Sequence, residues 1–196
     1  MMVIGITGGL ASGKTTLARM LQRRGFVHIN ADKIVHDLLQ HDAQVIAAIS
    51  AAFRSVTAAK KIDRRKLGEL VSHDEAALAT LEGILHPAVR RAEIAAIKLA
   101  MRQRRKAVLF DVPLLFETGA DDLCDVTITA TAPEPHRRRR AFLRPHMTPE
   151  KYARLTARQY CESERLTLAD MVIPTGLGKC FTRRLATLWL KELGLV

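Results

Sequence analysis

The chain has 196 residues, of which 48% are hydrophobic, and its formal net charge at pH 7 is +11. This length fits one α/β domain with a sizeable core and a small inserted subdomain, and the lack of any run of about eighteen apolar residues predicts no membrane span. A strand pattern where a signal peptide would begin, and three widely spaced cysteines with no CxxC pair, indicate a cytoplasmic protein without a disulfide framework or a zinc site.

The first motif is the glycine-rich stretch over residues 8–15, which fits the pattern G-x-x-x-x-G-K-[ST] of a phosphate-binding P-loop. Residues 3–7 before it are apolar and β-branched, which predicts a buried strand. A helical pattern follows over residues 16–24 and ends at Gly25. Strand, loop and helix in this order aim backbone N–H groups and a helix N-terminus at an anion. A glycine-rich turn that binds nothing is the alternative, and this context argues against it.

Each residue type in the loop has a chemical role. Gly8 and Gly13 permit backbone angles and a close approach that a Cβ atom would block. Lys14 is a point charge that can reach the β- and γ-phosphates, and the Thr15 hydroxyl is placed to ligate Mg²⁺. The loop therefore predicts a site for a phosphate chain together with its metal ion.

A second strand is expected over residues 26–30, followed by a helical pattern through Ile34, Val35, Leu38 and Leu39. Asp32 stands at the carboxyl end of that strand, where open α/β sheets bind their ligands. It is thus placed for chemistry. The same residue type also caps helices well, and position alone leaves both interpretations open.

Residues 42–105 have an almost wholly helical pattern. We expect a helix over residues 42–53, a loop over residues 55–62, a helix with Asp63 as its N-cap, and a further helix that opens at Ser72 or Asp74. The pair His86-Pro87 predicts a break, because proline suits the first turn of a new helix. So long a helical insertion between two strands suggests a substrate-binding subdomain. Plain helical packing without a ligand is the alternative.

A third strand is expected over residues 106–111, where an apolar run leads to Asp111. Beside a P-loop this is the pattern of a Walker B strand, whose carboxylate assists the Mg²⁺. Asp111 could instead cap the turn before Pro113. The seven histidines show no spacing typical of metal ligands, so we assign no metal to them.

A fourth strand, residues 125–131, precedes a helix with four consecutive arginines at residues 137–140 and Arg144 after it. A second helix follows the break at Pro145 and is capped at Thr148. This pair predicts a lid whose arginines stabilise charge on a transferring phosphoryl group. Most of the arginine run is expected to be a solvated basic face, because one helix cannot point four consecutive side chains inward.

The last strand is expected over residues 169–174, and a turn with Gly176 and Gly178 leads into a closing helix. The apolar residues of that helix are Phe181, Leu185, Leu188 and Trp189, and Trp189 is expected in the core rather than in a site. Strands that alternate with helices form parallel sheets. The sequence therefore predicts a three-layer α/β P-loop fold with a mostly parallel five-stranded sheet, a helical substrate-binding insertion and a helical lid.

With these elements in place, the chain resembles the dephospho-coenzyme A kinases of the nucleoside-monophosphate-kinase-like group. The resemblance spans nearly the whole chain. Its most specific motifs are the block Asp-Val-Pro-Leu-Leu-Phe-Glu at residues 111–117 and the pair His86-Pro87, whereas a P-loop alone would not separate this family from other kinases. The other matching segments are residues 6–16, 31–32, 62–67, 159, 164–166 and 169–173.

The resemblance implies transfer of the γ-phosphoryl group of ATP, with Mg²⁺, to the ribose 3′-hydroxyl of dephospho-CoA, the last step of coenzyme A synthesis. It implies three parts of one kinase domain, residues 1–196. These are a core of roughly residues 1–30, 106–133 and 169–196, a CoA-binding helical region of roughly residues 31–105, and a lid of roughly residues 134–168. The basic charge would then serve ATP and dephospho-CoA. We expect a cytoplasmic monomer or weak oligomer with no nucleic-acid or membrane partner.

The resemblance also implies catalytic residues. The family's catalytic aspartate matches Asp32, which favours a base that accepts or orients the attacking hydroxyl. The lid arginines match Arg140 and Arg144, and one extra residue in this segment makes Arg139 an alternative to Arg140. With Lys14, these residues form the expected catalytic set.

Binding residues follow from the same match. For ATP they are Gly8, Gly9, Ala11, Ser12, Gly13, Lys14, Thr15, Thr16 and Thr175. For the acceptor substrate they are Thr7, Asp32, Arg64, His86, Leu114 and Glu117. The expected Mg²⁺ ligands are Thr15 and Asp111.

Several positions depart from the family's pattern. The usual Asp-Ala-Asp is here Asn30-Ala31-Asp32, which keeps the acid that the reaction needs. His36 stands in place of an arginine, and Arg54 in place of a glycine. The usual Asn-Asn-Gly turn near the nucleotide base is Pro174-Thr175-Gly176.

Two other functions are compatible with the residues. A kinase of this fold could act on another hydroxyl, such as that of a nucleoside or a sugar, while the lack of an Asn-Lys-x-Asp motif argues against a GTPase. A non-enzyme alternative is a nucleic-acid-binding protein that uses residues 137–144. Trp189 and the two tyrosines do not alternate with the basic runs, which argues against a stacking platform for single strands.

Overall fold

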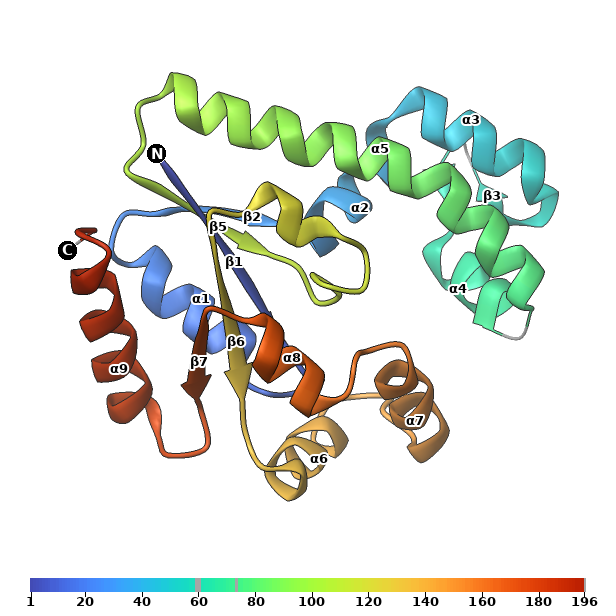
Figure 1. Cartoon of the computed structure of the whole chain (residues 1–196). Coiled ribbons are helices and arrows are strands. Elements are labelled where there is room, and N and C mark those ends of the chain that lie inside the picture. The colour runs from blue at the N-terminus through green and yellow to red at the C-terminus, as the bar shows by residue number, and fades with distance from the viewer. Residues whose placement is uncertain (59–60, 73, 196) are drawn as a thin grey trace. The chain divides into compact units, whose positions relative to one another are not determined.

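The structure is a computed structural model that describes residues 1–58, 61–72 and 74–195 (Figure 1). The chain divides into two compact units. The first is formed by Met1–Ile29 and Leu99–Val196, and it contains the P-loop sequence and the lid sequence. The second is Asn30–Lys98, which is the greater part of the helical insertion.

The first unit is built on a sheet with the strand order β2-β5-β1-β6-β7. The strands are β1 (Met2–Gly8), β2 (Val27–Asn30), β5 (Ala107–Asp111), β6 (Val126–Thr131) and β7 (Met171–Pro174). β1 pairs in parallel with both β5 and β6, and β6 pairs in parallel with β7. The carboxyl ends of these four strands therefore meet at one edge, which is where sheets of this kind bind ligands.

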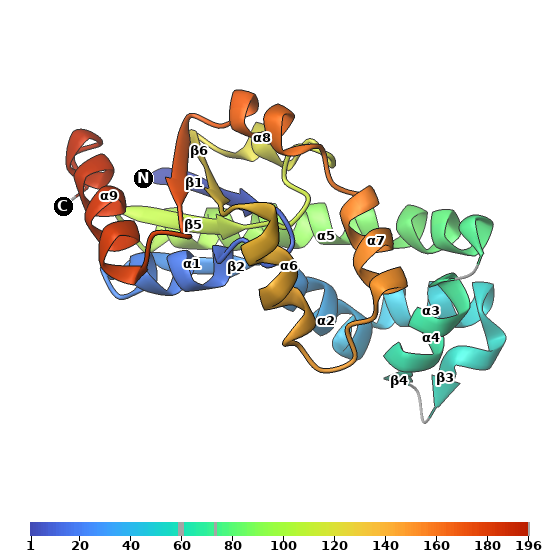
Figure 2. The same ribbon diagram turned by 90° about the horizontal axis from the view of Figure 1, so that it is seen from below.

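Helices cover both faces of this sheet (Figure 2). α1 (Lys14–Gln22) and α9 (Lys179–Glu192) lie on one face, and α8 (Glu162–Leu168) lies on the other. The core under α1 and α9 includes the buried side chains of Ile4, Ile6, Leu17, Leu21, Leu109, Ile128, Ile173, Trp189 and Leu190. The predicted three-layer α/β fold and mostly parallel sheet are confirmed.

The buried face of α9 differs in part from the expected one. Trp189 lies in the core, as predicted, together with Thr182, Ala186 and Leu190. Phe181 and Leu188 are 44% and 49% exposed, so placing them on the apolar face was wrong. At about 3.6 residues per turn, positions 182, 186, 189 and 190 form one stripe, and Phe181 and Leu188 lie beside it.

Three short helices follow β6 in the segment that was predicted to be a lid. They are α6 (Glu134–Phe142), α7 (Pro149–Ala157) and α8. The Thr148 hydroxyl accepts a hydrogen bond from the Lys151 N–H at 3.2 Å, which confirms the predicted cap of α7. α8 was not predicted from the sequence. Its start is stabilised by a cap at Cys161, a residue type that is not a usual N-cap.

The second unit is almost entirely helical and has its own core. It contains α2 (Ala31–His41), α3 (Ala43–Ala52), α4 (Arg64–Ser72) and most of α5 (Glu75–Arg102). Buried side chains of these helices pack together with Phe53, which follows α3; among them are Leu39, Val45, Ile49, Leu67 and Leu81. Asp63 caps α4 as predicted, through hydrogen bonds from the N–H groups of Arg65 and Lys66 at 3.0 and 3.1 Å. Asp74, one of two candidates, accepts from the N–H groups of Ala76 and Ala77 at the start of α5.

Two local predictions in this unit were wrong. The expected loop over residues 55–62 contains a 3₁₀ turn, η1 (Arg54–Val56), and the antiparallel strands β3 (Thr57–Ala58) and β4 (Lys61–Ile62), while residues 59–60 lie outside the described residues. The expected break at Pro87 is absent, because α5 continues through it. A proline removes one N–H and crowds the carbonyl four residues earlier, which belongs here to Gly83, a residue without a Cβ atom.

A short 3₁₀ helix, η2 (Ala120–Leu123), connects the segment after β5 to β6. Over residues 1–58, 61–72 and 74–195, none of the helices combines the length and the apolar character that a bilayer crossing requires.

Candidate active site

The P-loop connects the central strand β1 to α1. Ala11 and Gly13 adopt left-handed backbone conformations with φ of 60° and 96°, and the Ser12 N–H closes a turn on the Gly9 carbonyl at 2.9 Å. A Cβ at Gly13 would also lie 3.0 Å from the Thr175 hydroxyl, so glycine is required there on both grounds. Such turns present backbone N–H groups to an anion at a helix N-terminus. Thr15 and Thr16, on the first turn of α1, are exposed.

Lys14 binds the carboxylate of Asp111 at the end of the neighbouring strand β5. The other Asp111 oxygen lies 3.1 Å from His28 Nε2 on β2. Burial by itself would raise the pKa of Asp111, but the hydrogen bond with His28 and the charge of Lys14 outweigh it and lower the pKa below the ordinary value. Asp111 is therefore held as a carboxylate beside the P-loop, although it is only 1% exposed.

Thr175 and Arg140 lie against the other side of the loop. The Thr175 hydroxyl donates to the Ser12 carbonyl, and Arg140 Nη2 donates to the Thr175 carbonyl at 3.2 Å. Arg140 is half-buried by these contacts, whereas Arg139 and Arg144 are exposed. Of the two alternatives that the sequence left, Arg140 is thus the one that reaches the P-loop region.

Two further arginines, Arg137 of α6 and Arg165 of α8, lie over Gly9. A Cβ on Gly9 would be 2.5 Å from Arg137 Nη1 and 2.8 Å from Arg165 Nη2. Both side chains are buried, with exposed fractions of 9% and 4%. Arg137 pairs with Glu162 at 2.9 Å, and burial and the charge of Arg137 lower the pKa of Arg165. Arg137 is therefore the buried member of the four-arginine run, and Arg140 is the half-buried one.

The family-specific block after β5 packs beside the loop. The Thr7 side chain is fully buried, and its hydroxyl donates to the Pro113 carbonyl at 3.2 Å. Leu114 and Glu117 are half-buried. One Glu117 oxygen accepts from the Tyr160 N–H at 2.7 Å, and the other is buried without a hydrogen-bond partner among the described residues.

Asp32 belongs to the second unit, in the first turn of α2. The N-cap of α2 is Asn30, whose side-chain oxygen accepts from the Lys33 N–H at 2.8 Å. The capping role that competed for Asp32 is thus filled by its neighbour. Asp32 is exposed, and none of the side chains that the structure describes bonds to its carboxylate.

Two other predicted acceptor residues lie in the same unit. Arg64 Nη1 lies 2.7 Å from His36 Nδ1, and His36 is one helical turn after Asp32 on the same face of α2. The guanidinium of Arg64 therefore lies beside the position that the sequence comparison marks as a departure from the family pattern. His86 is exposed in the middle of α5.

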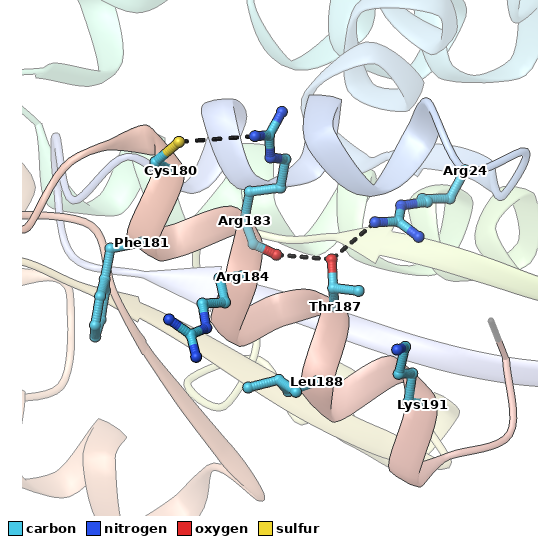
Figure 3. A pocket seen from close by; sticks show the side chains of 8 residues that line it. All are labelled: Arg24, Cys180, Phe181, Arg183, Arg184, Thr187, Leu188 and Lys191. Atoms are coloured by element: carbon cyan, nitrogen blue, oxygen red, sulfur yellow. Dashed lines mark hydrogen bonds between the residues drawn. The ribbon is translucent and has the colours of Figure 1, made fainter.

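A groove of about 660 Å³ lies along the exposed side of α9 (Figure 3). Arg24 Nη2 donates to the Thr187 hydroxyl at 2.8 Å across it. Its other lining residues are Cys180, Phe181, Arg183, Arg184, Leu188 and Lys191, which include four cations with Arg24. None of the residues that the sequence assigns to substrates lines this groove, so we place the candidate active site at the P-loop.

Comparison with known proteins decides the family. A family model described as dephospho-CoA kinase matches residues 2–177. The chain belongs to the dephospho-CoA kinase family. A Rhodospirillum rubrum protein named dephospho-CoA kinase is 46% identical over 178 residues, which covers 90% of this chain and 84% of that protein.

Solved structures support the same family fold. A Thermus thermophilus protein, TT1252, superposes with a TM-score of 0.83 at 28% identity and covers 98% of this chain and 97% of its own. A Campylobacter jejuni structure titled dephospho-CoA kinase has a TM-score of 0.67 at 24% identity, with 97% and 96% of the two chains covered, and shows the fold alone. The family model and the Rhodospirillum rubrum relative confirm the resemblance stated from the sequence motifs.

Sequence reasoning missed three side chains of this family site. His28 contacts Asp111, and Arg137 and Arg165 cover Gly9. Arg165 belongs to a matched motif, so its position carried a signal. His28 and Arg137 gave none, because a histidine inside a strand and one arginine among four look like structural or solvated residues until their partners are known.

Proposed function

We propose that this chain transfers the γ-phosphoryl group of ATP to the ribose 3′-hydroxyl of dephospho-CoA, giving CoA and ADP. Family membership supports the reaction class, and the lysine–aspartate pair Lys14–Asp111 beside the P-loop is the observation that carries it. A bond forms between the 3′-oxygen and the γ-phosphorus while the bond from that phosphorus to the β,γ-bridging oxygen breaks. The proton of the 3′-hydroxyl must be accepted in the same reaction.

Asp32 is the proposed acceptor of that proton. Phosphoryl transfer passes through a loose transition state, so the hydroxyl loses its proton late and the base needs no strongly raised pKa. Asp32 is exposed and caps no helix, so its carboxylate is open to an acceptor substrate. Lys14 and the backbone N–H groups of residues 8–16 are proposed to hold the phosphates. Thr175, which bonds to the loop, is proposed to lie beside the nucleotide.

The residues present fit a Mg²⁺ ion. Magnesium prefers a few hard oxygen ligands together with waters and substrate phosphates. The exposed Thr15 hydroxyl and the Asp111 carboxylate supply such oxygens, and the described residues contain no cluster of three or more His, Cys, Asp or Glu side chains that would hold a metal ion by themselves. When bound, the ion would neutralise charge on the β- and γ-phosphates.

Replacing Asp111 with asparagine tests this assignment. We expect the Mg²⁺ concentration for half-maximal rate to rise roughly tenfold or more, the loss that follows when a charged metal-site partner is removed. The rate is measured against total Mg²⁺ at fixed ATP, with Asp122→Asn of η2 as the exposed control. A half-maximal concentration equal to that of the wild type would exclude Asp111 from the site.

For the lid, we propose that Arg140 and Arg144 meet the transferring phosphates. Arg140 already bonds to Thr175 beside the P-loop, and the exposed Arg144 is free of such contacts. The helical region of residues 31–105 is proposed to bind the CoA portion, with Arg64 and His86. Thr7, Leu114 and Glu117 are proposed to complete that site. Unchanged turnover in Arg144→Ala would remove that residue from the proposal.

The direct test is a product assay. Purified protein with ATP and Mg²⁺ is offered dephospho-CoA, a nucleoside mixture, gluconate or shikimate, and ADP release is followed by a coupled reaction. We expect turnover with dephospho-CoA alone, and ³¹P NMR of the product should show a new phosphomonoester at the ribose 3′-position. No phosphorylation of dephospho-CoA, or phosphorylation at another hydroxyl, would contradict the proposal.

A further inference from the structure

Gln159, between α7 and α8, joins the base of the lid to the P-loop. Its Oε1 accepts a hydrogen bond from the Leu10 N–H at 2.8 Å. Its Nε2 faces two carbonyl oxygens, that of Gly8 at 3.4 Å and that of Pro113 at 3.3 Å. One half-buried side chain therefore bonds to backbone groups at the start of the P-loop and in the segment after β5.

These contacts use both ends of the primary amide. Leu10 offers a donor, while Gly8 and Pro113 offer acceptors, so the bridging side chain must accept at one atom and donate at another. A carboxylate can only accept, and an apolar side chain of the same size can do neither. The glutamine side chain is long enough to place its acceptor Oε1 at the Leu10 N–H and its donor Nε2 at the two carbonyl oxygens.

The segment that Gln159 holds has an unusual backbone. Ala11 follows it with a φ of 60°, a conformation that a residue with a Cβ adopts only when its surroundings impose it. The turn from Gly9 to Ser12 supplies one internal hydrogen bond. Contacts from outside the loop must therefore contribute to keeping its N–H groups aimed at an anion.

Two buried arginine side chains lie against Gly9 of the same segment. Arg137 and Arg165 approach Gly9 so closely that any Cβ at this position would collide with their nitrogens. Arg137 is fixed by Glu162 at 2.9 Å, and Arg165 by a hydrogen bond to the Tyr160 carbonyl. The contact between the lid base and the loop is thus held by buried, partnered groups and not by mobile surface side chains.

From these contacts we propose that Gln159 is a positioning residue for nucleotide binding. It holds the backbone of residues 8–10, at the start of the P-loop, in the phosphate-binding conformation and acts through that backbone, without touching the nucleotide. The inference rests on the proposed function in one respect, that this loop binds ATP. The inference goes beyond that function because it makes nucleotide affinity depend on Gln159, a residue at the base of the lid.

The test uses Gln159→Met, which keeps the size and removes the hydrogen bonds, and Gln159→Asn, which keeps the amide and shortens its reach. Binding of the fluorescent analogue mant-ADP is titrated, and KM is measured separately for ATP and for dephospho-CoA. We expect the mant-ADP Kd and the ATP KM to rise about tenfold, which corresponds to about 1.4 kcal/mol, with the dephospho-CoA KM unchanged. Gln103→Met is the matched control, because Gln103 is exposed and its side chain accepts from Arg105, two residues away.

The outcomes are distinct. A lower melting temperature in Gln159→Met with wild-type mant-ADP affinity would show a merely structural residue and overturn the proposal. Should the Met variant fail to fold, Gln159→Asn decides, and a wild-type Kd there overturns the proposal as well. Because mant-ADP binding does not depend on the acceptor, weakened binding in a protein that ignores dephospho-CoA would sustain this inference while the proposed function fails.

Discussion

Replacing Asp32 with asparagine is expected to lower the turnover of dephospho-CoA phosphorylation by roughly 10²–10⁴-fold, the range that a positioned proton acceptor contributes. Asparagine keeps the shape of the side chain but cannot accept the proton of the 3′-hydroxyl. Because Asn30, and not Asp32, caps α2, the substitution removes no helix cap and the fold is expected to persist. Steady-state turnover at saturating ATP measures the effect, and mant-ADP titration checks that nucleotide binding is retained.

The matched control is Asp37→Asn in the same helix. The side chain of Asp37 is 46% exposed, and it pairs with Lys33 at 2.5 Å on the surface of α2. Surface pairs of this kind contribute little to stability, so wild-type turnover is expected in the control. Near-normal turnover in Asp32→Asn would refute the role given to Asp32.

A second large effect is expected for Lys14→Ala. Loss of a charged hydrogen bond costs about 1.5–3 kcal/mol, so the mant-ADP Kd should rise roughly ten- to hundredfold and product should be almost undetectable. The variant also takes the ammonium group away from Asp111, which is 1% exposed. We therefore expect a lower melting temperature at pH 7 as well, because a buried carboxylate loses a cation that stabilises its charged form.

This loss of stability has a defined pH dependence. The folded-state pKa of Asp111 is lowered in the wild type, so its contribution to stability is present above the ordinary aspartate pKa and is lost as the pH falls. The difference in melting temperature between wild type and Lys14→Ala should shrink on acidification. Lys33→Ala, at an exposed surface pair, is the control for both readouts. Wild-type mant-ADP affinity in Lys14→Ala would remove Lys14 from the phosphate site.

The parts of the fold that the sequence predicted are those governed by local patterns. A glycine-rich loop between a β-branched run and a helical period has one common outcome, and it predicted β1, the P-loop and α1. The N-caps Asp63 and Thr148 were likewise predicted, since a cap depends on residues only three positions away. The strand pattern before Asp32 and the apolar run that ends in Asp111 located two strand ends at the edge where sheets of this kind bind ligands.

The parts that failed depend on partners distant in the sequence. Pro87 breaks an isolated helix, yet α5 continues because the rest of its length and its packing outweigh one lost hydrogen bond. The contact of His28 with Asp111 and the burial of Arg137 against Gly9 exist only once the strands and lid helices are assembled. No spacing pattern in the sequence predicts such contacts. His28 and Arg137 were therefore missed, whereas the family motifs were recognised.

The central proposal is that the P-loop holds ATP with its γ-phosphate in line with the ribose 3′-hydroxyl of dephospho-CoA. Asp32 is proposed to accept the proton of that hydroxyl. A crystal structure of the protein with a non-hydrolysable ATP analogue, Mg²⁺ and dephospho-CoA measures this most directly. The account predicts Lys14 Nζ on the β- and γ-phosphate oxygens and the Asp32 carboxylate within about 2.6–3.2 Å of the ribose 3′-oxygen. Lys14 turned away from the phosphates, or Asp32 remote from that oxygen, would contradict it.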